Sequence, residues 1–580
     1  MTEGQSMSGP GDFRKNFFKD VVDAATKEKH SGIAEVEKAY QDLEDAIYSN
    51  SDLSRGSTTS LPLPKIYIMW DEAHYLEKGL LRRESISGFS ILEHGKKISF
   101  SFFVSLSGRI APAAPPRSVD SSTRIHEGTL ESVPPFTDLG FDQLMSGRQV
   151  GRIGAQTLAD VTKLEYVVHM GRPLWGGRYD VGDKHVKNSI FDFAHEKLLC
   201  QKRWDFKGIK LSLQQTFACL SQRLALELDS RTRAALLEEK NLIENHMRVC
   251  LETGTGLDGL LTASSSEPIL SEVSSLTTRW CKDNFSMAEA LKMVLSYFPI
   301  RQEHHGALLV LVLFTIARDS AIPRDHEYSK DIFIVPVLSF FEQLFTEDIS
   351  DMLPSRVGSA HESRTFKEEF SRASLHFNHC IKPQNTGALN RSTLLGFIAR
   401  GAAIVHHAGV DMTIPFLFYD LELIKWNVGF ILAKVDHQAM PRARLFDTMD
   451  PFVLGLFEDG EPTVPIIRII FALGVPTEKA KLVRMPPYMQ GDFTSYDFWC
   501  AGMSPEIVKP GVSATSWTWD ALLAASCGRA RDSDSQSAEG SACRRQQEPL
   551  VGMDKEHWNQ FVDFTALDEG KAEDYLKDRH

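Results

Sequence analysis

The first residues that could do chemistry stand where an apolar run ends in acidic side chains. Ile66–Trp70 is followed directly by Asp71 and Glu72. In P-loop ATPases the first acidic residue after such a strand holds the magnesium shell, and a following glutamate activates the attacking water. Asp71 and Glu72 are therefore candidate catalytic residues, with Asp71 as the metal ligand. The alternative is a chance match, because any buried strand can end in acidic turn residues.

A phosphate-binding loop is missing ahead of these carboxylates. ATP hydrolysis requires a GxxxxGK[ST] loop, because backbone N–H groups and one lysine must hold the phosphates before a carboxylate can hold magnesium. Residues 9–16 come closest, but they place Arg14 where the second glycine belongs and Asn16 where the hydroxyl belongs. We therefore expect no ATP turnover. Either a loop is encoded upstream of Met1 or the ATPase-like element is degenerate.

A second apolar run, Ile98–Leu106, ends beside two hydroxyl side chains, Ser105 and Ser107. The charged stretch between the two runs suits a connecting helix, so the pattern predicts a parallel sheet. A polar residue at the end of the neighbouring strand would lie near the γ-phosphate, which makes Ser105 and Ser107 candidates for nucleotide binding. Arg124 and Arg172 are further candidates, because a guanidinium group matches phosphate geometry. Loop salt bridges are the alternative for both arginines.

Composition sets the broad class. The 580 residues predict about three or four domains, and 42% hydrophobic with 24% charged residues is typical of a globular protein. A net charge of −13 argues against strong nonspecific attraction of the whole protein to nucleic acid or anionic lipid, but it permits a local basic surface.

The eight scattered cysteines indicate reduced thiols. The polar N-terminus lacks a signal peptide, and the apolar run 307–317 is too short to cross a membrane. We expect a cytoplasmic or nuclear protein without membrane contact.

A wider set of motifs follows the acidic strand end. The set comprises SLSGRIAPAAP, SSTRI at residues 121–125, PPFTDLGFDQL, GRPLW at residues 171–175 and LSQRLALEL. It resembles the fungal Crinkler-like proteins, expanded in mushroom-forming fungi, which join a P-loop ATPase domain to a restriction-endonuclease-like domain. The resemblance covers most of residues 65–510. It implies a toxin or effector that works on DNA in the nucleus, with the ATPase as a regulatory or motor element.

The expected fold class is α/β, with an incomplete P-loop NTPase-like parallel sheet, a helical middle region and a restriction-endonuclease-like α/β domain. Expected helices cover 211–228, 288–297, 307–317, 332–345 and 392–407, although the length of the apolar runs 307–317 and 332–345 also permits strands. Expected strands cover 412–419, 428–435 and 466–473. The expected domains are an N-terminal helical segment (1–64), a partial P-loop ATPase-like core (65–155), a helical region (156–370), a restriction-endonuclease-like domain (371–525), a disordered linker (526–549) and a C-terminal tail (550–580).

The resemblance also implies a nuclease site. Restriction-type nucleases hold metal with an aspartate at one strand and a [DEQ]xK pair on the next, whose lysine positions or activates water. The aspartate falls on Asp411, a candidate metal ligand, and the lysine on Lys434. Leu432 stands where the second acidic ligand belongs, and Asp436 follows the lysine instead. Asp411, Lys434 and Asp436 are the candidate catalytic residues, and we expect that cleavage is lost.

The functional expectation is a degenerate Crinkler-like ATPase–nuclease fusion that acts as a binding or effector-type protein without ATP turnover. One alternative is a metal-dependent DNA nuclease using Asp411 and Lys434, and another is a helical adaptor protein. Magnesium is the candidate cofactor, and DNA or another protein is the candidate partner. The paired histidines at 304–305, 376–379 and 406–407 lack the cysteine pairs of a structural zinc site, so we expect surface or capping histidines.

Overall fold

The computed structural model divides into two compact units, Met1–Val104 and Ser105–His580. The residues that it describes are 66–70, 99–103, 141–145, 157–201, 210–224, 226–228, 233–253, 260–280, 286–298, 300, 305–323, 332–359, 361–382, 389–405, 410–418, 422–436, 442–473, 475, 479–487 and 489–510. Asp71, Glu72, Ser105, Ser107 and Arg124 lie outside this description.

In the smaller unit, strands β1 (Ile66–Trp70) and β2 (Ser99–Phe103) form a parallel pair, with Ile66 opposite Ser99 and Trp70 opposite Phe103. Parallel neighbours cannot be joined by a tight turn and need a crossover connection. The 28-residue spacing of the two apolar runs in the sequence allows such a connection. The prediction of two parallel strands is therefore confirmed.

The first half of the larger unit is mainly helical. The helices predicted at 288–297 and 307–317 are confirmed, and the helix predicted at 211–228 is confirmed over residues 213–224. Ser286 caps one of them by accepting the Glu289 N–H, as its place before an apolar-periodic run favours. The described elements are η2 (Gln143–Met145), α7 (Leu158–Val161), α8 (Leu164–Val167), α9 (Pro173–Val181), α10 (Lys184–Asn188), α11 (Ile190–Leu199), α12 (Leu213–Leu224), α13 (Arg233–Asn245), the antiparallel strands β3 (Val249–Thr253) and β4 (Leu260–Ala263), α14 (Pro268–Trp280), α15 (Met287–Tyr297) and α16 (His305–Ser320).

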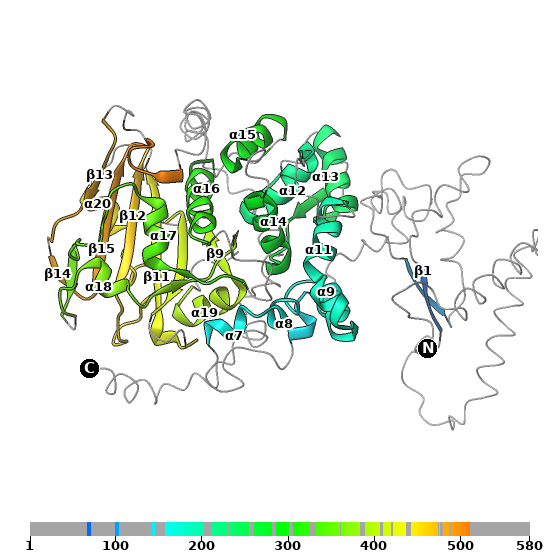
Figure 1. Cartoon of the computed structure of the whole chain (residues 1–580), viewed down its shortest axis with the longest axis horizontal. Coiled ribbons are helices and arrows are strands. Elements are labelled where there is room, and N and C mark those ends of the chain that lie inside the picture. The colour runs from blue at the N-terminus through cyan, green and yellow to red at the C-terminus, as the bar shows by residue number, and fades with distance from the viewer. Residues whose placement is uncertain are drawn as a thin grey trace, which may run out of the picture. The chain divides into compact units, whose positions relative to one another are not determined.

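The second half is built on a mixed sheet (Figure 1), in which eleven strands are described. The path runs β14-β6-β15-β12-β11-β10-β7-β5, with β13 on β15 and with β9 joining β8 to β10. The strands are β5 (Val335–Pro336), β6 (Arg356–Gly358), β7 (Ser374–Leu375), β8 (His379–Ile381), β9 (Ala402–Val405), β10 (Met412–Leu417), β11 (Val428–Asp436), β12 (Ile466–Ala472), β13 (Lys481–Arg484), β14 (Met489–Gly491) and β15 (Ser495–Ala501). The predicted strands at 412–419, 428–435 and 466–473 are confirmed.

The centre of this sheet combines both strand directions. β10 is antiparallel to both β9 and β11, whereas β11, β12 and β15 are parallel to one another. The central strands are buried along almost their whole length, which agrees with their apolar runs. The carboxyl ends of β11, β12 and β15 therefore meet at one edge of the sheet.

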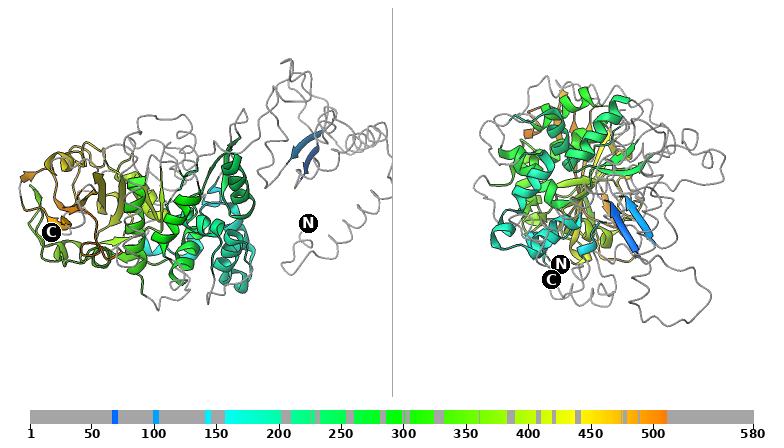
Figure 2. Two further views of the ribbon diagram at one scale, coloured as in Figure 1. Left: turned by 90° about the horizontal axis from the view of Figure 1, so that it is seen from above. Right: turned by 90° about the vertical axis from the view of Figure 1, so that its right-hand side faces the viewer.

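Helices cover both faces of the strands. On one face the rings of α16 and α17 (Val337–Leu344) contact Phe471 and Phe498. On the other face Arg468 donates to the carbonyl of Phe446, in α20 (Arg442–Asp447). The remaining helical elements are α18 (Phe366–Phe370), α19 (Arg391–Arg400) and η5 (Lys425–Asn427). Figure 2 shows the green and teal helices gathered beside the yellow and orange strands.

Three predicted helices are shorter than expected. The helix predicted over 211–228 ends at Leu224, and Leu228 instead forms an isolated antiparallel bridge with Ile300. The helix predicted over 392–407 ends at Arg400, because Gly401 adopts φ +68° and caps it, and residues 402–405 form β9 instead. The helix predicted over 332–345 begins only at Val337, after the short strand β5. None of the helices within the described ranges is long and apolar enough to span a membrane.

Candidate functional site

Asp411 stands directly before β10, and its backbone N–H donates to the carbonyl of Ala433 at 3.0 Å. Its carboxylate Oδ2 accepts the backbone N–H of Val435 at 2.6 Å. Because Met412 is opposite Ala433 in the antiparallel register, Asp411 comes opposite Lys434. The structure therefore brings the candidate aspartate and the candidate lysine together on neighbouring strands.

Leu432, Lys434 and Asp436 alternate along β11, so their side chains share one face of the sheet. Lys434 is half-buried, whereas Asp436 is 4% exposed and Leu432 is fully buried. All three candidate nuclease residues thus lie at one end of the β10–β11 pair. The expected second acidic ligand is absent there, because the buried position two residues before Lys434 is apolar.

The next strand offers no substitute beside Leu432. Arg468 of β12 is its partner in register, and Arg468 makes a buried bidentate ion pair with Asp497 of β15. The two contacts measure 2.7 Å from Nε to Oδ1 and 2.6 Å from Nη2 to Oδ2. Among the described residues, no three His, Cys, Asp or Glu side chains are grouped to hold a metal ion. The residues present therefore do not fit the full ligand set of a restriction-type metal site.

Arg172, the one nucleotide-binding candidate in the described ranges, is tied to Glu267. Its Nη1 lies 2.8 Å from Glu267 Oε1, its backbone N–H donates to Oε2 at 3.1 Å, and its Nη2 donates to the carbonyl of Met247 at 2.6 Å. These contacts fix the start of α9. A contact between Arg172 and a nucleotide stays a prediction.

The Glu267 carboxylate also accounts for the residue types at neighbouring positions of the GRPLW motif. Trp175 is fully buried, and its Nε1 donates to Glu267 Oε2 at 2.6 Å. Gly171 has φ +89°, and a Cβ there would lie 2.4 Å from Glu267 Cγ. Glycine is required because the backbone is left-handed and because Glu267 approaches so closely. In the described structure the motif acts as a clamp on Glu267.

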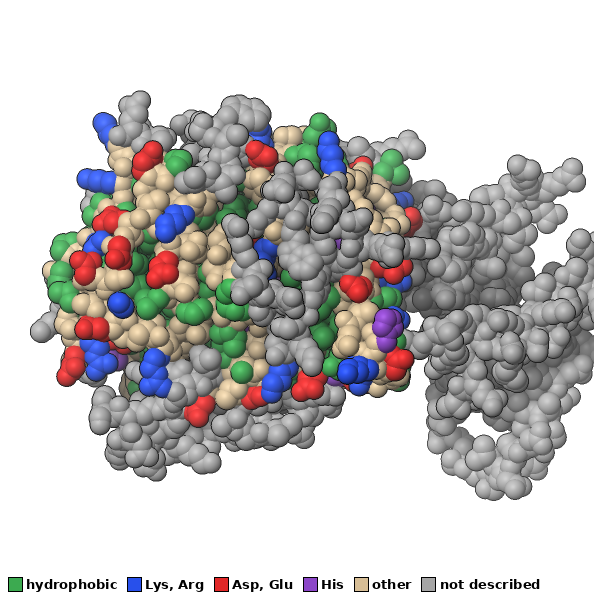
Figure 3. Space-filling model, viewed as in Figure 1, with side chains coloured by type: hydrophobic (Ala, Val, Ile, Leu, Met, Phe, Trp, Pro, Cys, Tyr) green, Lys and Arg blue, Asp and Glu red, His purple; other side chains and the backbone are tan. Residues whose placement is uncertain are grey.

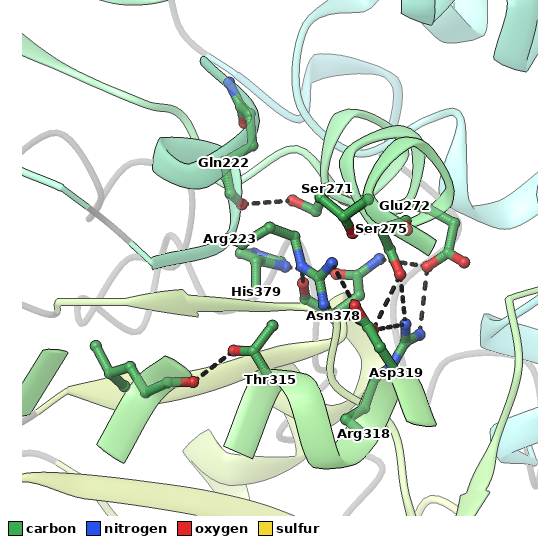
Figure 4. A network of polar contacts seen from close by, with 12 residues as sticks. Gln222, Arg223, Ser271, Glu272, Ser275, Thr315, Arg318, Asp319, Asn378 and His379 are labelled. Carbon is green, nitrogen blue, oxygen red and sulfur yellow. Dashed lines mark hydrogen bonds and ion pairs between the residues drawn. The ribbon is translucent and has the colours of Figure 1, made fainter. Parts of the chain in front are cut away.

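A buried polar network lies between the helices and the sheet (Figure 4). Arg223 of α12 contacts Asp319 through Nη1 at 3.1 Å and Nη2 at 2.9 Å, and Arg318 reaches the same carboxylate at 2.9 Å. Arg318 also pairs with Glu272 of α14 at 3.3 Å. Arg223 Nε donates to the backbone carbonyl of Asn378, directly before β8. The network therefore joins three helices to one strand.

Electrostatics favour the charged form of this network. Burial would raise the pKa of Asp319, but Arg223 and Arg318 outweigh it and hold the pKa at about 2. Burial would lower the pKa of Arg318, but Glu272 and Asp319 raise it above its ordinary value. The sequence analysis missed these residues. Charges on helices usually face solvent, and the only possible signal was their occurrence in strongly apolar segments.

A second group of buried charges sits near the GRPLW clamp. Arg400 of α19 contacts Asp142 Oδ1 at 3.1 Å and donates from Nε to Ser266 Oγ at 2.7 Å. Asp142 Oδ1 also accepts the backbone N–H of Gly171 at 2.7 Å. Burial raises the pKa of Asp142 to about 6, against the effect of Arg400. Asp142 lies in the PPFTDLGFDQL motif, so this motif and GRPLW meet in space.

His376 and His379 are buried, so the expectation of surface histidines is wrong for this pair, whereas His376 contacts a carbonyl in the last turn of α19 as a capping side chain does. His379 Nε2 lies 2.7 Å from Ser266 Oγ, and His376 Nδ1 lies 2.7 Å from the carbonyl of Ile398. Burial lowers the pKa of His376 to about 4 and that of His379 well below its ordinary value. The apolar neighbours Leu375 and Phe377 could have indicated this burial.

Comparison with known proteins adds no assignment to this geometry. No protein-family model, curated protein or solved structure matches the chain.

One hollow of about 360 Å³ lies among α7, α8, α9 and α10. His169, one of its lining residues, contacts Asp180 through Nε2 at 3.0 Å and the carbonyl of Glu165 through Nδ1 at 2.7 Å. Both ring nitrogens are thus engaged, and His169 has no nitrogen left to act as a general base in this arrangement. The lining mixes three acids with two lysines: Asp160, Lys163, Glu165, Tyr166, His169, Tyr179, Asp180 and Lys187.

Proposed function

We propose that the larger unit contains a restriction-endonuclease-like domain that binds nucleic acid without cleaving it. The observation that carries this proposal is the register of β10 and β11. It sets Asp411 opposite Lys434, as in the nuclease arrangement, with buried Leu432 in the place of the second acidic ligand. The strand order β9-β10-β11-β12-β15, with β10 alone antiparallel, supports it because it supplies the required pair of neighbouring strands.

Binding without cleavage follows from the ligand count. A metal that activates water at a phosphate must itself be held by several oxygen ligands in fixed positions. Leu432 supplies none, and its neighbour Arg468 brings a positive charge that Asp497 already neutralises. Contacts to phosphate oxygens need only positive charge and hydrogen-bond donors, so they survive the loss of the metal ligand. The proposal includes no ATP turnover, because residues 9–16, the nearest match to a phosphate loop, carry Arg14 and Asn16 where a glycine and a hydroxyl side chain are required.

Two assays on the full chain test this function. Fluorescence anisotropy with labelled duplex and single-stranded DNA at low salt should show binding, and Lys434→Glu should weaken it at least about tenfold. Supercoiled plasmid should remain intact with magnesium or manganese. The exposed Lys367→Glu is a matched charge-reversal control for the binding assay. Absence of binding to every nucleic acid tried would refute the proposal.

The metal-dependent nuclease remains a second candidate because Asp436 shares a sheet face with Lys434, while Asp411 stands opposite. In that case the second carboxylate would follow the lysine rather than precede it. Plasmid cleavage that Asp411→Asn and Asp436→Asn each abolish would establish this activity, provided that both variants keep the unfolding midpoint of the parent. Cleavage that survives both substitutions would point to a contaminating nuclease.

A further inference from the structure

One row of residues crosses four neighbouring strands at the carboxyl edge of the sheet. Asp436 of β11 is opposite Ala472 of β12, Ala472 is opposite Ala501 of β15, and Ala501 is opposite Lys481 of β13. Neighbouring strands lie about 4.8 Å apart, so Lys481 stands roughly 14 Å from Asp436 along this row. β13 therefore brings a lysine to the edge where the candidate nuclease residues lie.

Two lysines at this edge are open to solvent. Lys481 begins β13, Lys479 precedes it by two residues, and both side chains are exposed. Figure 3 shows basic side chains at the surface over β13, at the upper left. Within the described residues neither lysine has a hydrogen-bond or ion-pair partner. Arg484, on the same strand, is instead held by Asp351 at 2.7 Å and by Glu347 at 2.8 Å.

The backbone fixes this segment against the sheet. Four residues of β13 pair with β15, from Lys481 opposite Ala501 to Arg484 opposite Phe498. Gly502 follows β15 with φ +72°, and a Cβ there would lie 3.0 Å from the carbonyl of Val475. Lys481 is therefore carried on a paired strand beside the nuclease-like edge, and Lys479 lies two residues before that strand.

We propose that Lys479 and Lys481 contact the phosphates of a nucleic acid bound across the carboxyl edge of β11, β12 and β15. This inference rests on the proposed function and adds a phosphate-binding strip outside the Asp411–Lys434 pair. Lysine contacts to phosphate act as point charges and carry no sequence information. A chain with net charge −13 does not favour nonspecific attraction to nucleic acid as a whole, so a local basic strip directs nucleic acid to this edge.

The test compares charge reversals on the full chain. We expect Lys479→Glu with Lys481→Glu to weaken binding of a labelled duplex at least about tenfold and to reduce the slope of log K against log salt by about 2. The matched control is Lys184→Glu with Lys367→Glu, two exposed lysines in the first turns of α10 and α18, where glutamate is favourable. Urea unfolding midpoints should stay unchanged in both double variants.

The outcomes separate the two proposals. If the parent protein binds no nucleic acid, the proposed function and this strip both fail. If the parent binds and the Lys479/Lys481 variant binds equally well, the strip is wrong while the proposed function stands. If the parent binds phosphatidylserine vesicles more tightly than duplex DNA, the assignment to nucleic acid is overturned. Weaker binding by the Lys479/Lys481 double variant, with unchanged binding by the Lys184/Lys367 control, supports the strip.

Discussion

Two charged regions of the larger unit differ in how their charges are used. In the network around Asp319, both arginines have carboxylate partners and all the charged groups are largely withdrawn from water. At the carboxyl edge of the sheet, Lys479 and Lys481 project into solvent. In the first region the charges hold helices and a strand together. The second leaves charges accessible to a ligand.

The free-energy cost of burying a charge explains why the two regions differ. Taking an ion out of water costs several kcal/mol, and a buried pair recovers this only with good geometry and further hydrogen bonds. Asp319 meets that condition because two arginines and Ser275 contact its oxygens. An exposed lysine stays hydrated, so it carries no desolvation cost, and it contributes little to stability. Substitutions should therefore separate the regions by their effects on unfolding and on binding.

The largest effect should come from Asp319→Ala. Arg223 and Arg318 would both stay buried without their shared carboxylate, so the free energy of unfolding should fall by about 3–5 kcal/mol. Urea denaturation followed by circular dichroism measures this change. Asp351→Ala is the control, because Asp351 pairs with Arg484 while its side chain is 83% exposed, and it should change stability by less than about 1 kcal/mol. Equal effects of the two substitutions would remove the distinction drawn here.

The clamp on Glu267 gives the next largest effect. Gly171→Ala would place a Cβ 2.4 Å from Glu267 Cγ in a left-handed backbone, so we expect a loss of about 2–3 kcal/mol. Gly177, six residues on in α9, has no atom within 4 Å of its Cβ position. Gly177→Ala should raise stability by up to about 1 kcal/mol through helix propensity. A neutral Gly171→Ala would show that Glu267 can move aside.

The strands that the sequence predicts well are those with continuous apolar runs. β10, β11 and β12 fall within one or two residues of the expected bounds, because strands that are covered on both faces of a sheet are apolar along nearly their whole length. β15 was not predicted, since Ser495 and Asp497 interrupt its pattern. Both side chains are buried there and contact Arg468 of the neighbouring strand. Such pairing depends on register, which single-strand patterns do not contain.

The site residues were likewise predicted only in part from the sequence. The resemblance pointed to Asp411 and Lys434, and the antiparallel register of β10 and β11 sets them opposite each other. The buried network was beyond local patterns, because Arg223 and Asp319 are 96 residues apart. Periodicity indicates which face of a helix is buried, but it does not identify the partner of a charge on that face. Only the packing of α12, α14 and α16 supplies that information.

A third prediction concerns pH, and it sharpens the role of the buried histidines beside the network. The pKa of His376 is lowered to about 4 from its ordinary 6.5. Its contribution to stability is therefore present above pH 6.5 and is lost as pH falls toward 4. Between pH 7 and 4.5 the loss should be on the order of 2 kcal/mol. Urea denaturation of His376→Asn over this range should show a correspondingly smaller fall than the parent.

Asp142→Asn should change the same profile in the opposite direction. Because the pKa of Asp142 is raised to about 6 from 3.8, the parent loses stability through this group as pH rises through 6, and the variant should not. The charged groups that face Asp142 are Arg400 from α19 and Glu267 beside α14. Arg400 attracts the ionised carboxylate and Glu267 repels it, so burial decides the sign. Parallel pH profiles for the parent and both variants would contradict a neutral buried His376 and a raised pKa for the buried Asp142 carboxyl.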